Sequence, residues 1–384
     1  MRTFELRKFV APEFVFGMGA RHLAGRYARN FRAKKVLVVT DKGILKADLV
    51  KSVIDSLQAS EIEIEIFSEI EPNPRTENVM QGAELFQRTG CSALIAVGGG
   101  SVIDSAKGIG IVSSNHQHIT EFEGVDRVRI PSPPIICIPT TAGSSADVSQ
   151  FAIISDPTRR MKMALISKML VPDIALIDPE TLLTMPSDLT ANTGVDVLTH
   201  AIEAYVSNAS SPITDLHALE SIRLITKYLP LVMQQPDNPE YRAETMLASL
   251  HAGLAFSNAS LGAVHAMAHS LGGYLDLPHG LSNALLLDSV IAYNYPAAPE
   301  KYDAVGRIMG MPGSTGSSER CRSLQDHIRS FRVSVGITGS LGTLGMHTED
   351  IPKLTEYAMH DACMATNPRR PAQKEIEAIY AAAL

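Results

Sequence analysis

The sequence of 384 residues contains no tryptophan, and only 5% of its residues are aromatic, so a hydrophobic core must be built mainly from aliphatic side chains. Its four cysteines, Cys91, Cys137, Cys321 and Cys363, are far apart and form no CxxC pair. Scattered cysteines argue against a disulfide framework and fit the reduced thiols of an intracellular protein. We therefore expect a cytoplasmic location.

Blocks of basic residues are also absent, and the formal net charge is −7. Nucleic acids and anionic membrane surfaces attract clustered lysine and arginine, so we expect neither as a partner. The N-terminal residues contain no apolar run of the kind that a signal peptide needs. The most apolar long segment, residues 243–273, is interrupted by histidine, serine and asparagine, so we interpret it as buried helix and not as a membrane span.

The rest of the composition is ordinary for a globular protein, and the length suggests about two domains. The first half alternates strand-like and helix-like segments, which predicts a mostly parallel sheet covered by helices. The strands are expected at residues 35–41, 61–67, 92–97 and 134–139, and the helices at 49–57 and 78–90. Because the spacing is helical from about residue 186 onwards, we predict an α/β domain over residues 1–185 and an all-α domain over residues 186–384.

A glycine-rich segment directly follows the third of these strands. Gly98, Gly99, Gly100 and Ser101 stand between a buried strand and an expected helix. Glycines let the backbone approach a ligand closely, and free N–H groups at a helix start favour a phosphate. A plain strand-to-helix turn is the alternative interpretation, because the segment is not the GxGxxG fingerprint of dinucleotide-binding proteins.

A second loop of small residues strengthens the phosphate interpretation. Thr140, Thr141 and Ser144 offer hydroxyl groups directly after the strand at 134–139. Loops at the carboxyl ends of parallel strands can line one crevice, where the ligands of open α/β sheets bind. Asp41 ends the first predicted strand and could accept hydrogen bonds from a ribose. Its charge would repel a 2′-phosphate, which favours NAD over NADP, although loop aspartates are also common turn residues.

Three histidines lie unusually close together among small and apolar neighbours. His265 and His269 are four residues apart on one expected helix, and His279 follows after a Gly-Gly break. Asp196 and His200 are also four apart, so they share one face of an earlier helix. A carboxylate with imidazoles suits Fe²⁺ or Zn²⁺. The spacing leaves open whether His265 or His269 is the ligand, and histidines paired within the core are the alternative interpretation.

Taken together, these segments make the chain resemble the group III, iron-containing alcohol dehydrogenases over nearly its whole length. The resemblance rests on five motifs: GGGSVIDSAKG at residues 98–108, PTTAGSSADVS at 139–149, TGVDVLTHAIEAYVS at 193–207, NASLGAVHAMAHSLGGYLDLPHGLSNALLL at 258–287 and DACMATNPR at 361–369. The two histidine-containing motifs together are very specific.

The resemblance implies a dinucleotide-binding α/β domain followed by an all-helical, metal-binding catalytic domain, an architecture shared with dehydroquinate synthase. It implies NAD(P)-dependent interconversion of short primary alcohols or diols and aldehydes, with Fe²⁺ or Zn²⁺ as Lewis acid. His269 would be a catalytic residue near the substrate and the nicotinamide, and Phe256 would contact the alcohol. The metal ligands would be Asp196, His200, His265 and His279.

The resemblance also implies a set of cofactor contacts. Gly98, Gly99, Gly100 and Ser101 would lie against the pyrophosphate. Asp41 and Asn73 would be at the adenosine ribose, Leu182 near the adenine and Lys162 at the nicotinamide ribose. The cofactor path would be lined by Thr140, Thr141, Ser144 and Ser149.

The chain departs from the family pattern at two positions. Asp147 stands where the family usually has Glu, a conservative change that could tune cofactor fit. Asp288 stands where the family usually has Pro, beyond the last ligand, and we expect little effect on the chemistry.

Three other functions are weighed beside the alcohol dehydrogenase. A polyol dehydrogenase of the glycerol type would share the fold, although such enzymes usually hold zinc through three protein ligands. A metallohydrolase would have no use for the two small-residue loops, and a binding protein would hold no metal. We also expect a homodimer or larger homo-oligomer.

Overall fold

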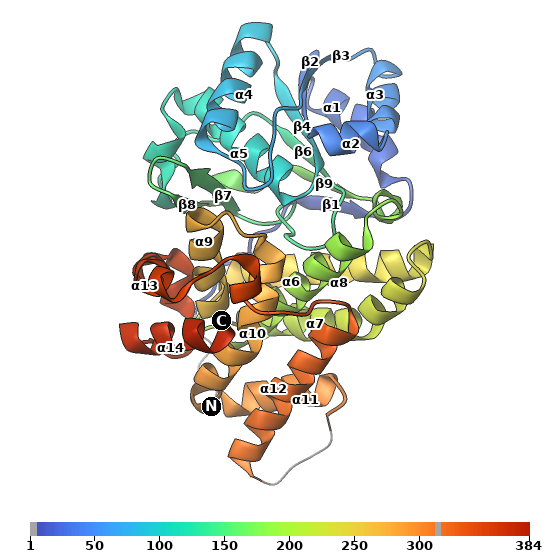
Figure 1. Cartoon of the computed structure of the whole chain (residues 1–384). Helices are drawn as coiled ribbons and strands as arrows, with labels where there is room; N and C mark the ends of the chain where they lie inside the picture. Colours follow the sequence, from blue (N-terminus) through green and yellow to red (C-terminus); the bar gives the residue numbers. More distant parts are fainter. Residues whose placement is uncertain (1–5, 312–315) are drawn as a thin grey trace.

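A six-stranded parallel sheet forms the upper half of the computed structural model, which describes residues 6–311 and 316–384 (Figure 1). Its strand order is β1-β9-β6-β4-β2-β3, and every neighbouring pair is parallel. The strands are β1 (Glu13–Phe16), β2 (Lys35–Val39), β3 (Glu63–Phe67), β4 (Ala93–Gly98), β6 (Ile135–Pro139) and β9 (Ile174–Ile177). The predicted α/β class and the four predicted strands are confirmed.

Helices cover both faces of this sheet. One face packs against α4 (Thr76–Thr89) and α5 (Gly100–Asn115), and the other against α1 (Ala24–Asn30) and α3 (Lys51–Gln58). The central strands β2, β4 and β6 are therefore almost continuously apolar and buried, as expected for a parallel sheet covered on both sides. The edge strand β3 alternates Glu and Ile because part of it faces solvent.

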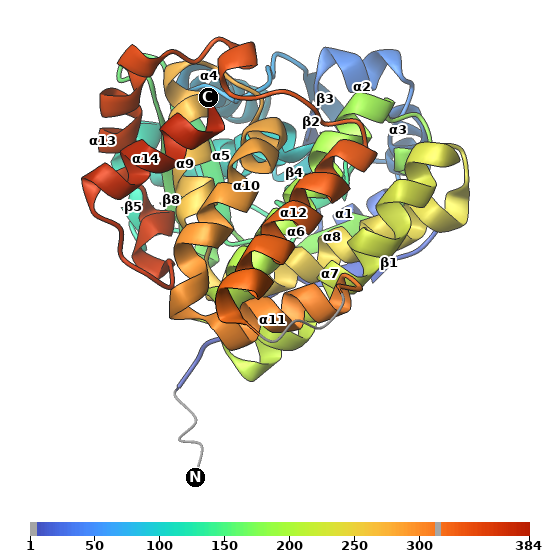
Figure 2. The same ribbon diagram turned by 60° about the horizontal axis from the view of Figure 1, so that its bottom comes forward.

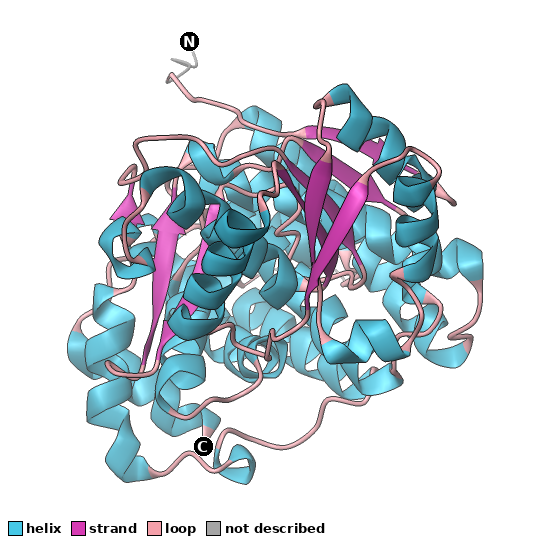
Figure 3. Cartoon of the chain, turned by 90° about the horizontal axis from the view of Figure 1, so that it is seen from above, coloured by secondary structure: helices cyan, strands magenta, loops and turns pink. Residues whose placement is uncertain are grey.

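A second, three-stranded sheet was not predicted from the sequence. It has the order β5-β8-β7, and Figure 3 shows it beside the larger sheet. The strands are β5 (Gly124–Val125), β7 (Phe151–Asp156) and β8 (Met161–Ile166); β7 and β8 form an antiparallel hairpin. Strand β1 also precedes the first predicted strand, so Asp41 follows the second strand of the chain and not the first. Strand β8 carries a lysine inside its apolar run, so periodicity alone does not reveal it.

The lower half is helical, as predicted, and the part of the chain described after Ile177 contains no strand. Three helices, α6 (Ser187–Val206), α9 (Ala263–Tyr274) and α10 (His279–Asn294), lie at its centre and are buried almost all round. Around them lie α7 (Pro212–Gln234), α8 (Pro239–Ala259), α11 (Pro299–Ile308), α12 (Ser317–Ser334), α13 (Ile351–His360) and α14 (Gln373–Ala383). Figure 2 shows α11 and α12 in front of α6.

Helix α6 begins just after the predicted domain boundary at residue 185, but the N-terminal segment crosses to the helical half before it enters β1. The amide of Val10 donates to Asn258 Oδ1 (2.6 Å), whose Nδ2 donates back to the Val10 carbonyl (3.0 Å). The ring of Phe9 lies 5.9 Å from that of His217. The division into domains at residue 185 stays a prediction. Among the residues described, no helix is both long and apolar enough to cross a membrane.

Candidate active site

A cavity of about 960 Å³ lies between the sheet and the central helices. One wall is formed by loops at the carboxyl ends of β2, β4 and β6, where α/β proteins bind their ligands. The opposite wall is formed by α6, α8, α9 and the start of α10. At the mouth, Asn73 Nδ2 donates to Asp276 Oδ1 across 2.7 Å, which links the two halves.

Three of the four predicted metal ligands converge on the helical wall. The Nε2 atoms of His265 and His279 lie 3.7 and 3.9 Å from Asp196 Oδ1, and the ligand atoms of all three residues lie within 4.8 Å of one another. His200, one turn after Asp196, has its Nδ1 3.8 Å from the same oxygen. Its ring lies 4.5 Å from Phe256 and 4.3 Å from His265. His200 is therefore adjacent to the three-residue group but not part of it.

The chemistry of this group fits a divalent cation. Burial lowers the pKa of His200 to about 4 and that of His265 to about 3, so both rings are neutral and offer a lone pair. Asn283 Nδ2 donates to Asp196 Oδ1 (2.6 Å) and also lies 3.1 and 3.2 Å from Nε2 of His265 and His279. A single amide nitrogen thus faces three acceptors. Imidazole nitrogen with carboxylate oxygen is a donor set of Fe²⁺ and Zn²⁺.

An unpartnered atom of His200 supports the same interpretation. Its Nδ1 is buried, has no hydrogen-bond partner and lies 3.8 Å from Asp196 Oδ1. Buried polar atoms are normally paired, so this nitrogen marks a place where a further partner fits. Asp196, His265 and His279 would hold the ion, and His200 is the nearest additional ligand.

His269 lies one turn beyond His265 on α9 and is held by a different carboxylate. Its Nδ1 lies 2.8 Å from Asp361 Oδ2, and the other oxygen of Asp361 accepts the amide N–H of Cys363 (2.8 Å). Burial alone would raise the pKa of Asp361, but the neighbouring His269 and these hydrogen bonds outweigh it and lower that pKa. Because Nδ1 is engaged, Nε2 is the nitrogen of His269 available to a ligand in the cavity.

The sheet-side wall is built from small residues and backbone. Gly99, Gly100 and Ser101 lie at the start of α5, and a Cβ at Gly100 would stand 2.6 Å from Ser144 Oγ. Thr140 Oγ1 is buried without a hydrogen-bond partner, as expected of a hydroxyl that faces a ligand. The close approach that glycine permits is therefore used here. The other predicted residues on the cavity lining are Asp41, Asn73, Thr141, Ser144, Ser149, Lys162 and Phe256.

Family models match both halves of the chain. The "Iron-containing alcohol dehydrogenase" model matches residues 11–179, and the "Fe-containing alcohol dehydrogenase family, C-terminal" model matches residues 190–384. The chain belongs to the iron-containing alcohol dehydrogenase family.

Individual relatives agree with this assignment over the whole chain. Alcohol dehydrogenase 4 of Schizosaccharomyces pombe is 40% identical, over 100% of this chain and 90% of its own length. NAD-dependent methanol dehydrogenase of Bacillus methanolicus is 34% identical, over 98% and 99%. The crystal structure of a 1,3-propanediol oxidoreductase superposes with a TM-score of 0.95 at 36% identity, covering 99% of this chain and 100% of that one.

Two of the residues implied by the family resemblance lie away from the cavity surface. Leu182 is fully buried in a cluster with Ile177 and Leu254, while Thr181 and Met185 beside it line the cavity instead. Gly98 does not line the cavity either, since it still belongs to β4, and its carbonyl accepts the Thr140 amide. The cofactor contacts implied for these two residues stay predictions.

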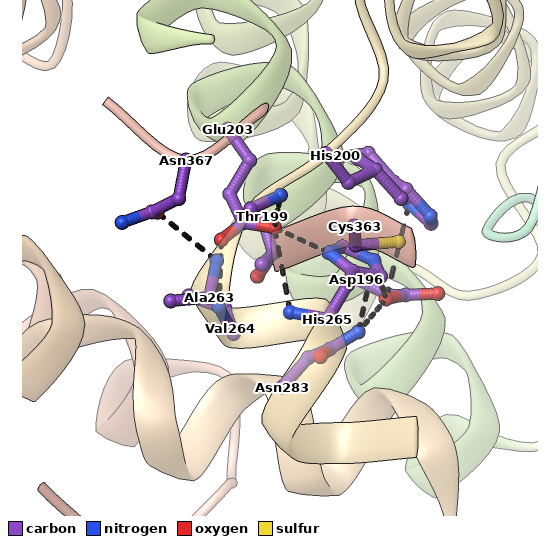
Figure 4. A network of polar contacts seen from close by, with 12 residues as sticks. Asp196, Thr199, His200, Glu203, Ala263, Val264, His265, Asn283, Cys363 and Asn367 are labelled. Carbon is purple, nitrogen blue, oxygen red and sulfur yellow. Dashed lines mark hydrogen bonds and ion pairs between the residues drawn. The ribbon is translucent and has the colours of Figure 1, made fainter. Parts of the chain in front are cut away.

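The sequence analysis also missed residues that belong to the site. Asp104 lines the cavity one turn into α5, accepts the Ile153 amide (3.1 Å), and has its pKa raised to about 6 by burial. Near it lies Lys162 on β8, which the family resemblance did imply, and its pKa is lowered to about 8, again mainly by burial. Glu203 is buried on α6 and bonded to His265 (Figure 4). Its spacing was a usable signal, because Glu203 lies seven residues after Asp196 and shares its helix face.

Proposed function

We propose that the protein interconverts short-chain primary alcohols or diols and the corresponding aldehydes, with NAD(H) as the redox partner and a divalent cation as Lewis acid. Membership of the family makes it an oxidoreductase acting on CH–OH groups. The observation that carries the proposal is the shared cavity: the Asp196, His265 and His279 group faces the glycine loop at Gly99 and Gly100 across it. An alcohol on the cation would therefore lie beside a dinucleotide on the loop.

The bound groups would supply the electronic chemistry, the cation by lowering the pKa of the alcohol hydroxyl and the nicotinamide by accepting hydride. The side chains of the protein would hold and orient these groups. Asp196, His265 and His279, with His200 as the proposed fourth ligand, hold the cation. Phe256 forms an apolar wall beside His200. His269, fixed through Nδ1 by Asp361, presents Nε2 to the cavity and is placed to accept the hydroxyl proton.

The sheet-side residues would bind the cofactor. Backbone N–H groups at Gly99, Gly100 and Ser101, at the start of a 16-residue helix, suit the pyrophosphate. Lys162 would reach the nicotinamide ribose. Asp41 would accept from the adenosine ribose and repel a 2′-phosphate, so we propose NAD over NADP.

For the metal and for the substrate we propose a chemical class and not a single species. The donor set does not separate Fe²⁺ from Zn²⁺; the family name favours iron. The substrate end of the cavity is bordered by Phe256, Leu261 and Cys363 beside the histidines, which suits a small, mainly apolar alcohol. A compact diol such as that of the propanediol oxidoreductase fits the same description. The relatives named as alcohol and propanediol dehydrogenases do not favour the glycerol-type polyol that the sequence analysis weighed.

The decisive experiment assays a panel of short alcohols, diols and aldehydes with NAD(H) and NADP(H). Protein of measured metal content is loaded anaerobically with Fe²⁺ or with Zn²⁺. Turnover of a primary alcohol with NAD by the metal-loaded protein alone is expected. NADH fluorescence that does not change on titration, or equal activity of the metal-free protein, would contradict the proposal.

We propose, in addition, that the protein is a homodimer or larger homo-oligomer and is cytoplasmic. Strand β1 supports self-association, because within the described residues it is an edge of the large sheet, pairs with β9 alone and exposes Phe14 by 40%. Light scattering coupled to size-exclusion chromatography measures the mass, and a monomeric mass would contradict the oligomer.

A further inference from the structure

Glu203 makes a set of contacts that neither the metal group nor the cavity explains. It projects from α6 and is only 4% exposed. Its oxygens accept the backbone N–H groups of Gly262 (3.0 Å) and Val264 (2.7 Å) at the first turn of α9. Its Oε2 also lies 2.7 Å from Nδ1 of His265. Figure 4 shows the carboxylate between this turn and the imidazole ring.

The direction of these hydrogen bonds determines which ring nitrogen of His265 carries the proton. Burial raises the pKa of Glu203 to about 7, while the N–H groups of Val264, Gly262 and His265 favour the ionised form. The ionised carboxylate accepts and cannot donate, so Nδ1 of His265 holds the hydrogen beside it. On the other side of the ring, Asn283 Nδ2 donates toward Nε2 at 3.1 Å, which requires Nε2 to be bare. Two partners on opposite edges thus select the same tautomer. The bare Nε2 is the atom that lies 3.7 Å from Asp196 Oδ1 in the metal group.

We infer that Glu203 is a positioning residue for the cation: it holds His265 in the Nδ1–H tautomer with Nε2 aimed at the metal group, without touching the ion itself. Carboxylates bonded to the far nitrogen of a ligating histidine orient the ring and increase its basicity. The inference rests on the metal centre of the proposed function. It assigns to a residue outside the cavity a share of the metal affinity.

The same helix offers a matched control. One turn after His265, His269 is bonded through Nδ1 to Asp361 (2.8 Å) in the same geometry. His269 lies outside the Asp196, His265 and His279 group, although with Asp361 and Cys363 it forms a second group that could hold a metal ion. Neutralising Asp361 removes an equivalent buried carboxylate-histidine bond outside the first group, and the titration therefore counts the Zn²⁺ ions bound as well as their affinity.

The experiment compares full-length wild type, Glu203→Gln and Asp361→Asn, each stripped of metal and titrated with Zn²⁺ against a chromophoric chelator. Glutamine has nearly the shape of glutamate, but its NH₂ can donate to Nδ1 and stabilise the tautomer with the proton on Nε2. We expect Zn²⁺ to bind about 10- to 100-fold more weakly to Glu203→Gln. Asp361→Asn should stay within about threefold of wild type. Equal Zn²⁺ affinity in wild type and Glu203→Gln would overturn the inference.

Glu203 also caps the N-terminus of α9, so a purely structural role must be separated. Long-range ¹H–¹⁵N spectra of the metal-free proteins report which nitrogen of His265 is protonated. We expect Nδ1–H in wild type and a shift toward Nε2–H in Glu203→Gln; an unchanged tautomer would overturn the inference. If Glu203→Gln does not fold, Glu203→Asp keeps the charge and should weaken Zn²⁺ binding less than tenfold; affinity lost as completely as in His265→Ala would contradict the assigned role.

Failure of the inference and failure of the proposed function give different results. If the wild-type protein binds neither Zn²⁺ nor Fe²⁺, the proposed metal centre is contradicted, and the proposed role of Glu203 is contradicted with it. A wild type that binds metal normally, together with a Glu203→Gln variant of equal affinity, leaves the function intact and removes only the positioning role.

Discussion

The two walls of the cavity differ in what they present to a ligand: the sheet side presents backbone and small residues, and the helical side presents ionisable side chains. On the sheet side, Gly99, Gly100 and Ser101 present backbone at the end of a strand, and the neighbouring Thr140 and Ser144 are small. On the helical side, buried ionisable side chains on α6, α9 and α10 converge, and each is held by further polar groups such as Glu203 and Asn283.

This difference decides how each wall can be damaged. A wall of backbone loses its function when atoms are added, because an extra Cβ fills the space for the ligand. A wall of converging side chains loses its function when atoms are removed, because each ligand supplies one bond. Substitutions on the two sides should therefore separate metal binding from cofactor binding.

The largest effect is expected from removing a side chain on the helical wall. His265→Ala should abolish stable metal binding and lower kcat/KM at least about 10³-fold, since several kcal/mol of Lewis-acid stabilisation are lost. NADH should still bind, because the sheet-side wall is intact. Metal analysis, steady-state kinetics and NADH fluorescence measure the three quantities, with the exposed His347→Ala as control. Loss of NADH binding together with the metal would show that the walls are not independent.

Adding a methyl group to the sheet-side wall should instead weaken cofactor binding and leave metal binding intact. At Gly100 a Cβ would meet Ser144 Oγ at 2.6 Å, so the loop or Ser144 must shift and the backbone N–H groups move away from the pyrophosphate. Gly100→Ala should weaken NADH binding about 5- to 100-fold and leave the metal content unchanged. Gly99→Ala is the graded control, because its Cβ would meet Thr141 only at 3.2 Å. Equal affinities for all three proteins would contradict the role of the loop.

Cofactor choice tests the same wall by charge. Asp41 lines the cavity, and its side chain also accepts the Ile44 amide (2.9 Å) at the start of α2 (Lys42–Lys46). Asp41→Ser keeps a capping oxygen and removes the negative charge. A like-charge pair near a surface is worth about 1–4 kcal/mol before screening, so preference for NAD over NADP should fall about tenfold. If the ratio of kcat/KM with NAD to kcat/KM with NADP is unchanged, a residue other than Asp41 discriminates between the two cofactors.

Lys162 predicts a pH dependence of cofactor binding. Burial lowers its pKa to about 8, so its ammonium is charged below that pH and neutral above it. Any attraction to the cofactor is therefore present below pH 8 and lost as the pH rises through that value. The dissociation constant of NADH should increase less than about tenfold between pH 7 and 9. In Lys162→Met the dissociation constant should no longer change between pH 7 and 9. A change that persists would mean that another group titrates.

The smallest effect is expected far from both walls. Asp288, where the family usually has Pro, accepts from Arg329 through Nε (3.0 Å) and Nη2 (2.7 Å), which links α10 to α12. Arg329 is half exposed, so solvent screening limits the pair to at most about 1 kcal/mol. Asp288→Asn should lower the melting temperature by about 2 °C or less, with metal content and NADH affinity unchanged. A change in either would contradict the expectation of no chemical effect.

Sequence reasoning found the elements whose signal is local. The strand before Gly98 is a continuous apolar run, and the histidines on α9 are spaced for one helix face, so both were recognised in isolation. The hairpin of β7 and β8 was missed, because its residues are buried by α5 and α9, elements far from it in sequence. Leu182 shows the same limit, because its burial depends on neighbours such as Leu254, which the sequence around Leu182 does not identify.

The sequence by itself determined the fold class, because periodicity records which face of each element is buried. Its motifs carried the family resemblance and named the residue types able to hold a metal and a phosphate. Spacing left open which of His265 and His269 is the ligand, and the family resemblance implied His265. Only the tertiary structure shows which contacts each ring makes, because the two share a helix face and a neighbourhood in sequence. Packing of α9 against α6 sets the first beside Asp196 and Glu203, while the segment at Asp361 holds the second. The physical reason is that a ligand set is made where separate elements meet, and no single element encodes its partner.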